Sequence, residues 1–152
     1  MDQRLHHPRA RRLKVVLDLA VKDEKQALQR WGQFQQKLQH EQEKQTQLSS
    51  YREDYQRHLS SPVKGVITSG AIHNTMDFIG QIETALKSQS KQLAQLERQT
   101  ETAHSHYMEL HAKTQALEKM IQRLEDSYVA QQNKAEQVEA DEWVTRSLRT
   151  RH

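Results

Sequence analysis

The 152-residue chain contains no cysteine and very little glycine, proline or phenylalanine. Without cysteine it can form neither disulfides nor thiolate metal sites, which fits a reducing compartment. Four glycines and two prolines leave little material for the turns of a strand-rich domain. No apolar run approaches the length of about 18 residues that a membrane-spanning helix needs, and the N-terminus lacks the apolar core of a signal peptide. These absences predict a soluble, cytoplasmic protein built from helices.

Patterns typical of catalysis are missing as well. The sequence has no phosphate-binding glycine loop. Among the nine histidines, His104 and His111 share a helix face but lie seven residues apart, and no carboxylate is expected beside them. We therefore expect no enzymatic activity, no cofactor and no metal site.

An apolar stripe with a seven-residue repeat runs through most of the chain. Its first part comprises Leu13, Leu17, Ala20, Glu24, Ala27, Trp31, Phe34, Leu38, Glu41, Gln45, Leu48, Arg52, Tyr55 and Leu59. Its second part comprises Ile82, Leu86, Gln89, Leu93, Leu96, Thr100, Ala103, Tyr107, Leu110, Thr114, Leu117, Ile121, Leu124, Tyr128, Gln131, Ala135 and Val138, led in after a one-step change of phase by Ile72, Met76 and Ile79. A repeat of 3.5 residues sustained over this length is the signature of a coiled coil.

The stripe is interrupted once, over residues 60–70, where Pro62, Gly65 and Gly70 favour a turn. The sequence thus predicts an all-α protein, a long antiparallel two-helix coiled-coil hairpin forming a single elongated unit over residues 1–152. We expect the first helix over about 10–59, the turn over about 60–70 and the second helix over about 71–148. Ser69 is the expected N-cap of the second helix.

A hairpin register follows from matching the two stripes layer by layer. One register places polar opposite polar and bulky opposite small, as a coiled-coil seam requires. Its facing pairs include Gln45 with Gln89, Trp31 with Ala103, and Leu13 with Ile121. Three charged seam residues would then face apolar partners and should extend their charged ends to water, namely Glu24, Glu41 and Arg52.

The second helix should continue beyond Ile121 for roughly 25 to 30 residues without a partner in the chain. Its stripe there carries Leu124, Tyr128, Ala135 and Val138. An exposed apolar stripe on a single helix calls for another chain, although fraying of this end in the free protein is the alternative.

Basic residues gather at both ends of the chain although its net charge is only +3. They include Arg9, Arg11 and Arg12 near the start, and Arg146 and Arg149 near the end. Such ends could dock on an acidic protein surface or on nucleic acid, or simply keep the protein soluble. Nucleic acid is the weaker interpretation, because no stacking aromatics are interleaved with these charges.

Two aromatic residues, Tyr51 and Phe78, lie one position off the stripes, and the hairpin brings them within about a turn of each other near the loop. Large aromatics beside a seam suggest an exposed partner-binding patch, although they could merely shield the edge of the seam. The residues of this candidate patch are Leu48, Tyr51, Tyr55, Phe78, Ile82 and Ala85.

Several segments resemble the flagellar export protein FliJ family, in order and over nearly the whole length. They are Leu17-Asp18-Leu19-Ala20 followed by Glu24 and Ala27, then Leu48-x-x-Tyr51-Arg52-x-x-Tyr55, Phe78-Ile79-x-x-Ile82, and Glu136-Gln137-x-x-Ala140-Asp141-Glu142. The turn differs from that family, because Pro62, Val63, Val66 and Ile67 stand where small polar residues are expected.

The resemblance implies a non-enzymatic component of the bacterial flagellar type III export apparatus, and so a role in flagellum biogenesis, motility and chemotaxis. It implies a fold similar to the stalk, or γ subunit, of F-type ATPases. The implied partners are the hexameric export ATPase, the cytoplasmic domain of the export gate, and export chaperones, with the membrane reached only through these partners. The patch around Tyr51 and Phe78 would face the gate, and the terminal arginines would face the ATPase ring. A homomeric coiled-coil scaffold remains the alternative, with a nucleic-acid-associated protein behind it.

Overall fold

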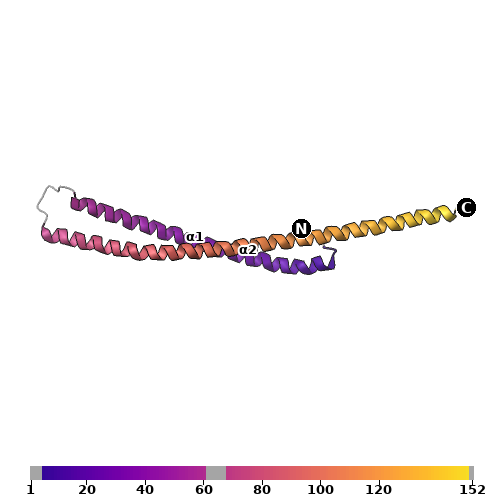
Figure 1. The fold of residues 1–152 in the computed structure, drawn as a ribbon, viewed down its shortest axis with the longest axis horizontal. Coiled ribbons are helices and arrows are strands. Elements are labelled where there is room, and N and C mark those ends of the chain that lie inside the picture. The colour runs from indigo at the N-terminus through magenta and orange to yellow at the C-terminus, as the bar shows by residue number, and fades with distance from the viewer. Residues whose placement is uncertain (1–4, 61–67, 151–152) are drawn as a thin grey trace. The chain divides into compact units, whose positions relative to one another are not determined.

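The computed structural model describes residues 5–60 and 68–150, and within them the chain forms two helices and no strand. The first helix, α1, spans Pro8–Ser60, and the second, α2, spans Ser69–Thr150 (Figure 1). The two helices pack against each other and run in opposite directions. The predicted all-α helical hairpin is therefore confirmed, and both helices begin and end within about two residues of the expected positions.

The start of α1 follows from the two residues that precede its first turn. Pro8 occupies the first helical position, where its fixed φ angle suits a helix and its missing amide hydrogen costs nothing. Nδ1 of His7 accepts the backbone N–H of Arg9 at 3.0 Å and that of Ala10 at 3.4 Å. His7 thus acts as the N-cap of α1, because it satisfies amides that have no partner within the helix.

At the start of α2 the expected cap is wrong by one residue. The hydroxyl of Thr68, and not that of Ser69, accepts the backbone N–H of Ala71 at 3.2 Å, and Ser69 is already helical. The expectations for Pro62, Val63, Gly65, Val66 and Ile67 lie outside the described residues.

The chain divides into two units, one made of residues 1–26 with 108–152 and the other of residues 27–107. In the first unit, Ala10, Leu17 and Ile121 are buried, with leucines of both helices packed against them. Leu13 belongs to the same cluster as Ile121, which agrees with the predicted register.

The second unit has a mixed seam, in which aromatic and polar layers separate the aliphatic ones. Ala27, Ile79, Ile82, Leu93 and Ala103 are buried. The centroid of the Trp31 ring lies 4.4 Å from that of His104 and 5.6 Å from that of Tyr107. Aromatic side chains therefore fill the layer in which a simple bulky-on-small pair was expected.

The lead-in to the second stripe also differs from the expectation. Thr75 is half-buried, whereas Met76 is 58% exposed. The seven-residue repeat therefore continues back from Ile82 through Ile79 to Thr75 without a change of phase. The apolar character of Met76 was misleading, because a seam position is fixed by spacing and can hold a small polar residue.

Candidate functional site

Polar contacts across the seam were the main feature that the sequence did not reveal. Nδ1 of His111 lies 2.5 Å from the Glu24 carboxylate, whose side chain is only 17% exposed. The hydrogen bond from His111 lowers the pKa of Glu24 below its ordinary value of 4.5, and this outweighs the opposing effect of burial. The absence of a carboxylate near His111 and the extension of Glu24 to water were therefore both wrong.

A second polar contact replaces the expected glutamine pair. The side-chain amide of the buried Gln89 donates to the main-chain oxygen of Glu41 at 3.2 Å and to its carboxylate at 3.4 Å, one turn of α1 away from Gln45. Lys44 holds the same carboxylate from its own helix at 3.3 Å. The hydrogen bond from Gln89 is the largest cause of a lowered pKa of Glu41.

A third contact docks the start of the chain on α2, and we call it the N-terminal clasp, made of His6, His7, Glu125 and Tyr128. The Glu125 carboxylate accepts the backbone N–H of His6 at 2.8 Å and that of His7 at 3.1 Å. These two amides lower the pKa of Glu125. The His6 ring stacks on Tyr128 at 6.4 Å, and the His7 ring meets it edge-on at 5.9 Å.

Because of the clasp, the partnerless part of α2 starts later than expected. Leu124 and Tyr128 are half-buried, and from residue 129 to residue 150 every side chain except that of Ser147 is exposed. We call residues 129–150 the C-terminal tail. It is helical throughout, and Ala135 and Val138 are exposed on it, as the stripe predicted.

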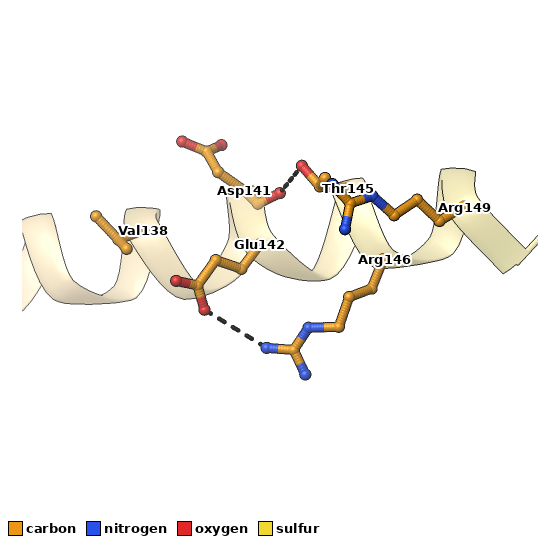
Figure 2. A pocket seen from close by; sticks show the side chains of 6 residues that line it. All are labelled: Val138, Asp141, Glu142, Thr145, Arg146 and Arg149. Atoms are coloured by element: carbon orange, nitrogen blue, oxygen red, sulfur yellow. Dashed lines mark hydrogen bonds and ion pairs between the residues drawn. The ribbon is translucent and has the colours of Figure 1, made fainter.

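The tail carries a shallow polar groove and several exposed apolar side chains. Figure 2 shows a shallow groove on one side, where Thr145 donates to the main-chain oxygen of Asp141 at 2.9 Å and Arg146 lies 3.4 Å from Glu142. Val138 and Arg149 also line this groove. All its residues come from one helix, so the groove is open to solvent.

The tail also bears apolar side chains that the stripe did not include, at about 100° (Trp143), about 200° (Val144) and about 240° (Leu148) around the helix from Glu142. Trp143 is 69% exposed and Leu148 is 60% exposed, with Val144 between them. The spacing of Ala140, Val144 and Leu148, four residues apart, was the available signal for Val144 and Leu148, whereas Trp143 lies off this line.

The basic residues of the two ends belong to the same unit but are separated along it. Arg9, Arg11 and Arg12 are exposed in the first turns of α1, close to the clasp at Glu125. Arg146 follows Glu125 by 21 residues on α2, which is roughly 30 Å along a helix. Arg146 forms an ion pair with Glu142, and both side chains are exposed. The two basic groups therefore offer separate contact points on one unit.

Near the loop, the structure brings the predicted aromatic residues together as an open surface. The rings of Tyr55 and Phe78 meet edge-on with centroids 4.8 Å apart, so Phe78 contacts Tyr55 across the seam. Tyr51 is 57% exposed and Phe78 is 43% exposed. We call the set of Leu48, Tyr51, Tyr55, Phe78, Ile82 and Ala85 the loop-end patch.

The members of this patch differ in accessibility. Ala85 is exposed and Leu48 is half-buried, whereas Ile82 is only 6% exposed. A partner could touch Tyr51, Tyr55 and Phe78 directly, while Ile82 supports them from within the seam.

The described residues offer little that would suit other kinds of site. In residues 5–60 and 68–150, no group of three or more His, Asp or Glu side chains could hold a metal ion. Neither described helix is long and apolar enough to cross a membrane.

A family model described as Flagellar FliJ protein matches residues 9–152. The chain belongs to the FliJ family. Membership makes it a component of flagellar export, and the suspected resemblance is confirmed over nearly the whole chain. No curated protein and no solved structure matches the chain.

Proposed function

We propose that this FliJ-family chain is a non-enzymatic stalk that links the hexameric flagellar export ATPase to the cytoplasmic domain of the export gate. It would also bind export chaperones and stay cytoplasmic, reaching the inner membrane only through the gate. The loop-end patch would bind the gate, and the unit with the basic ends would bind the ATPase.

The observation that carries this proposal is the exposed aromatic surface formed by Tyr51, Tyr55 and Phe78. Exposed Tyr and Phe beside a pair of packed helices are suited to protein binding, since aromatic anchors dominate the binding energy of many interfaces. Both helices of the seam come from one chain, which supports a stalk over a homomeric scaffold.

The ATPase-binding end is supported by charge and by exposed apolar area. Arg9, Arg11 and Arg12 are exposed on the first turns of α1, and the tail adds the exposed Trp143 and Leu148. A basic surface meeting an acidic pore would speed association and depend on salt. Two unlike helices inside a six-fold ring must touch the subunits unequally, so the chain could couple ATP turnover to the gate without catalysing anything.

Two double variants distinguish the gate-binding surface from the ATPase-binding surface. Tyr51→Ala with Phe78→Ala should weaken binding to the isolated gate domain by roughly 30-fold or more, because an aromatic anchor is commonly worth about 2 kcal/mol. The melting temperature should change little, since both side chains are partly exposed. ATPase binding should not change.

Arg11→Glu with Arg12→Glu should do the reverse, weakening ATPase binding in a salt-dependent way and sparing the gate. The matched control is Lys22→Glu with Lys25→Glu, two exposed bases on the same helix. If either double variant weakened gate binding and ATPase binding equally, the two-ended assignment would be contradicted. The same holds if the lysine control weakened ATPase binding as much as the arginine variant.

A further inference from the structure

Arg52 occupies a seam position of α1 within the loop-end region. It is half-buried, and its Nε is shielded from solvent and has no hydrogen-bond partner. The contact between Tyr55 and Phe78 fixes the local register. One turn earlier on α1, Arg52 therefore lies level with Ile82, which is 6% exposed.

The neighbouring acids do not neutralise this guanidinium. Asp54 holds Arg57 at 2.7 Å, and Asp77 holds His73 at 3.4 Å. Glu53 and Glu83 are exposed. Across the two described stretches of the chain, no carboxylate forms an ion pair with Arg52.

Shielding the Nε–H of Arg52 is costly, because the seam removes water from this donor without supplying an acceptor. The planar guanidinium of arginine donates two parallel N–H bonds to a carboxylate, which no other common side chain can do as well. Arginine beside tyrosine is also the composition of a binding hot spot. Arg52 lies close to Tyr51 and Tyr55 on α1, but its Nε–H has no hydrogen-bond acceptor.

We propose that the protein surface bound by the loop-end patch presents an Asp or Glu carboxylate to the guanidinium of Arg52, next to an apolar side chain that covers Tyr51 and Phe78. The inference rests on the proposed function, in which this patch binds the gate domain. The inference adds that the partner surface carries a carboxylate. It also makes Arg52, which is not a member of the loop-end patch, a determinant of which surface is bound.

Arg52→Met tests the proposal, because methionine keeps much of the apolar stem and removes the unpaired donor. The melting temperature should stay equal or rise. Affinity for the gate domain should fall about tenfold or more, and its dependence on salt should become weaker. Arg52→Lys keeps the charge without the fork, so its affinity should lie between the two.

Arg57→Met is the matched control. Arg57 is five residues further along α1, exposed, and paired with Asp54 in its own helix. Its replacement should leave both gate binding and the salt dependence as in the unaltered protein.

The outcomes separate the two proposals. If Tyr51→Ala with Phe78→Ala abolishes gate binding while Arg52→Met binds normally with the same salt dependence, the inference fails and the proposed function stands. A clear fall in the melting temperature of Arg52→Met would make Arg52 a structural residue and also overturn the inference. If the unaltered protein does not bind the gate domain, both fail.

Discussion

The carboxylate of Glu24 and the imidazole of His111, 87 residues apart in sequence, meet across the seam at 2.5 Å. The contact joins α1 to α2 in a layer that the heptad pattern alone would assign to apolar packing. The hydroxyl of Thr114 adds a smaller lowering of the Glu24 pKa. The polar groups of this layer favour one alignment of the two helices over others. They also make the stability of the seam dependent on pH.

The first prediction concerns acid. The pKa of Glu24 is lower in the folded chain than its ordinary value of 4.5. The resulting stabilisation is therefore complete above about pH 4.5 and is lost as the pH falls through the folded-state pKa. Glu41 and Glu125 act in the same direction, because their pKa values are lowered too. We expect the melting temperature of the unaltered protein to drop between about pH 5 and about pH 3.

Glu24→Gln should make this drop smaller, because glutamine does not titrate. Glu43→Gln, an exposed glutamate on the same helix, is the control and should keep the original slope. Identical slopes for the unaltered protein and Glu24→Gln would show that the contact with His111 contributes nothing to acid sensitivity.

The second prediction concerns the N-terminal clasp. Glu125→Ala removes the acceptor of two backbone amides, those of His6 and His7. In that variant these amides should exchange with solvent deuterium at nearly the rate of an unstructured chain, because nothing else described accepts them. The exchange of amides around Leu93 should not change. Unaltered protection of His6 and His7 would mean that Glu125 does not hold the N-terminus.

The third prediction tests the seam by paired leucine substitutions. Leu93 is 6% exposed and Leu28 is 45% exposed, both in the second unit. Leu93→Ala should lower the free energy of unfolding by about 2–5 kcal/mol, because it leaves a cavity between the helices. Leu28→Ala should change it by no more than about 0.5 kcal/mol. Denaturant unfolding of the two variants decides the point, and equal losses would contradict the assigned packing.

Much of the fold could be predicted because a seven-residue repeat fixes both the helical state and the buried face. Every position of the first stripe from Leu13 to Arg52 is buried or half-buried. The repeat weakens toward the loop, where Tyr55 and Leu59 are exposed. The pattern thus predicts a seam well where both helices are long and continuous, and less well near their ends.

The polar contacts could not be predicted in the same way. To predict the contact of Glu24 with His111, one must know the register of the two helices and the direction in which each side chain leaves its helix. The periodicity of the sequence indicates the register but not the direction. The clasp involves His6 and His7, which precede α1 and have no helical periodicity at all. For the loop-end patch the sequence supplied the residues, but only the structure shows that Phe78 contacts Tyr55 and that Ile82 is covered.

In the proposed function, one chain binds the export ATPase and the export gate at the same time. Sedimentation of the assembled ATPase with the cytoplasmic domain of the gate, with and without this protein, tests it most directly. We expect the gate domain to sediment with the ATPase only when the protein is present. Tyr51→Ala with Phe78→Ala should release the gate domain while the protein stays on the ATPase. A gate domain that stays in the supernatant, or that displaces the protein from the ATPase, would contradict simultaneous binding of the two partners.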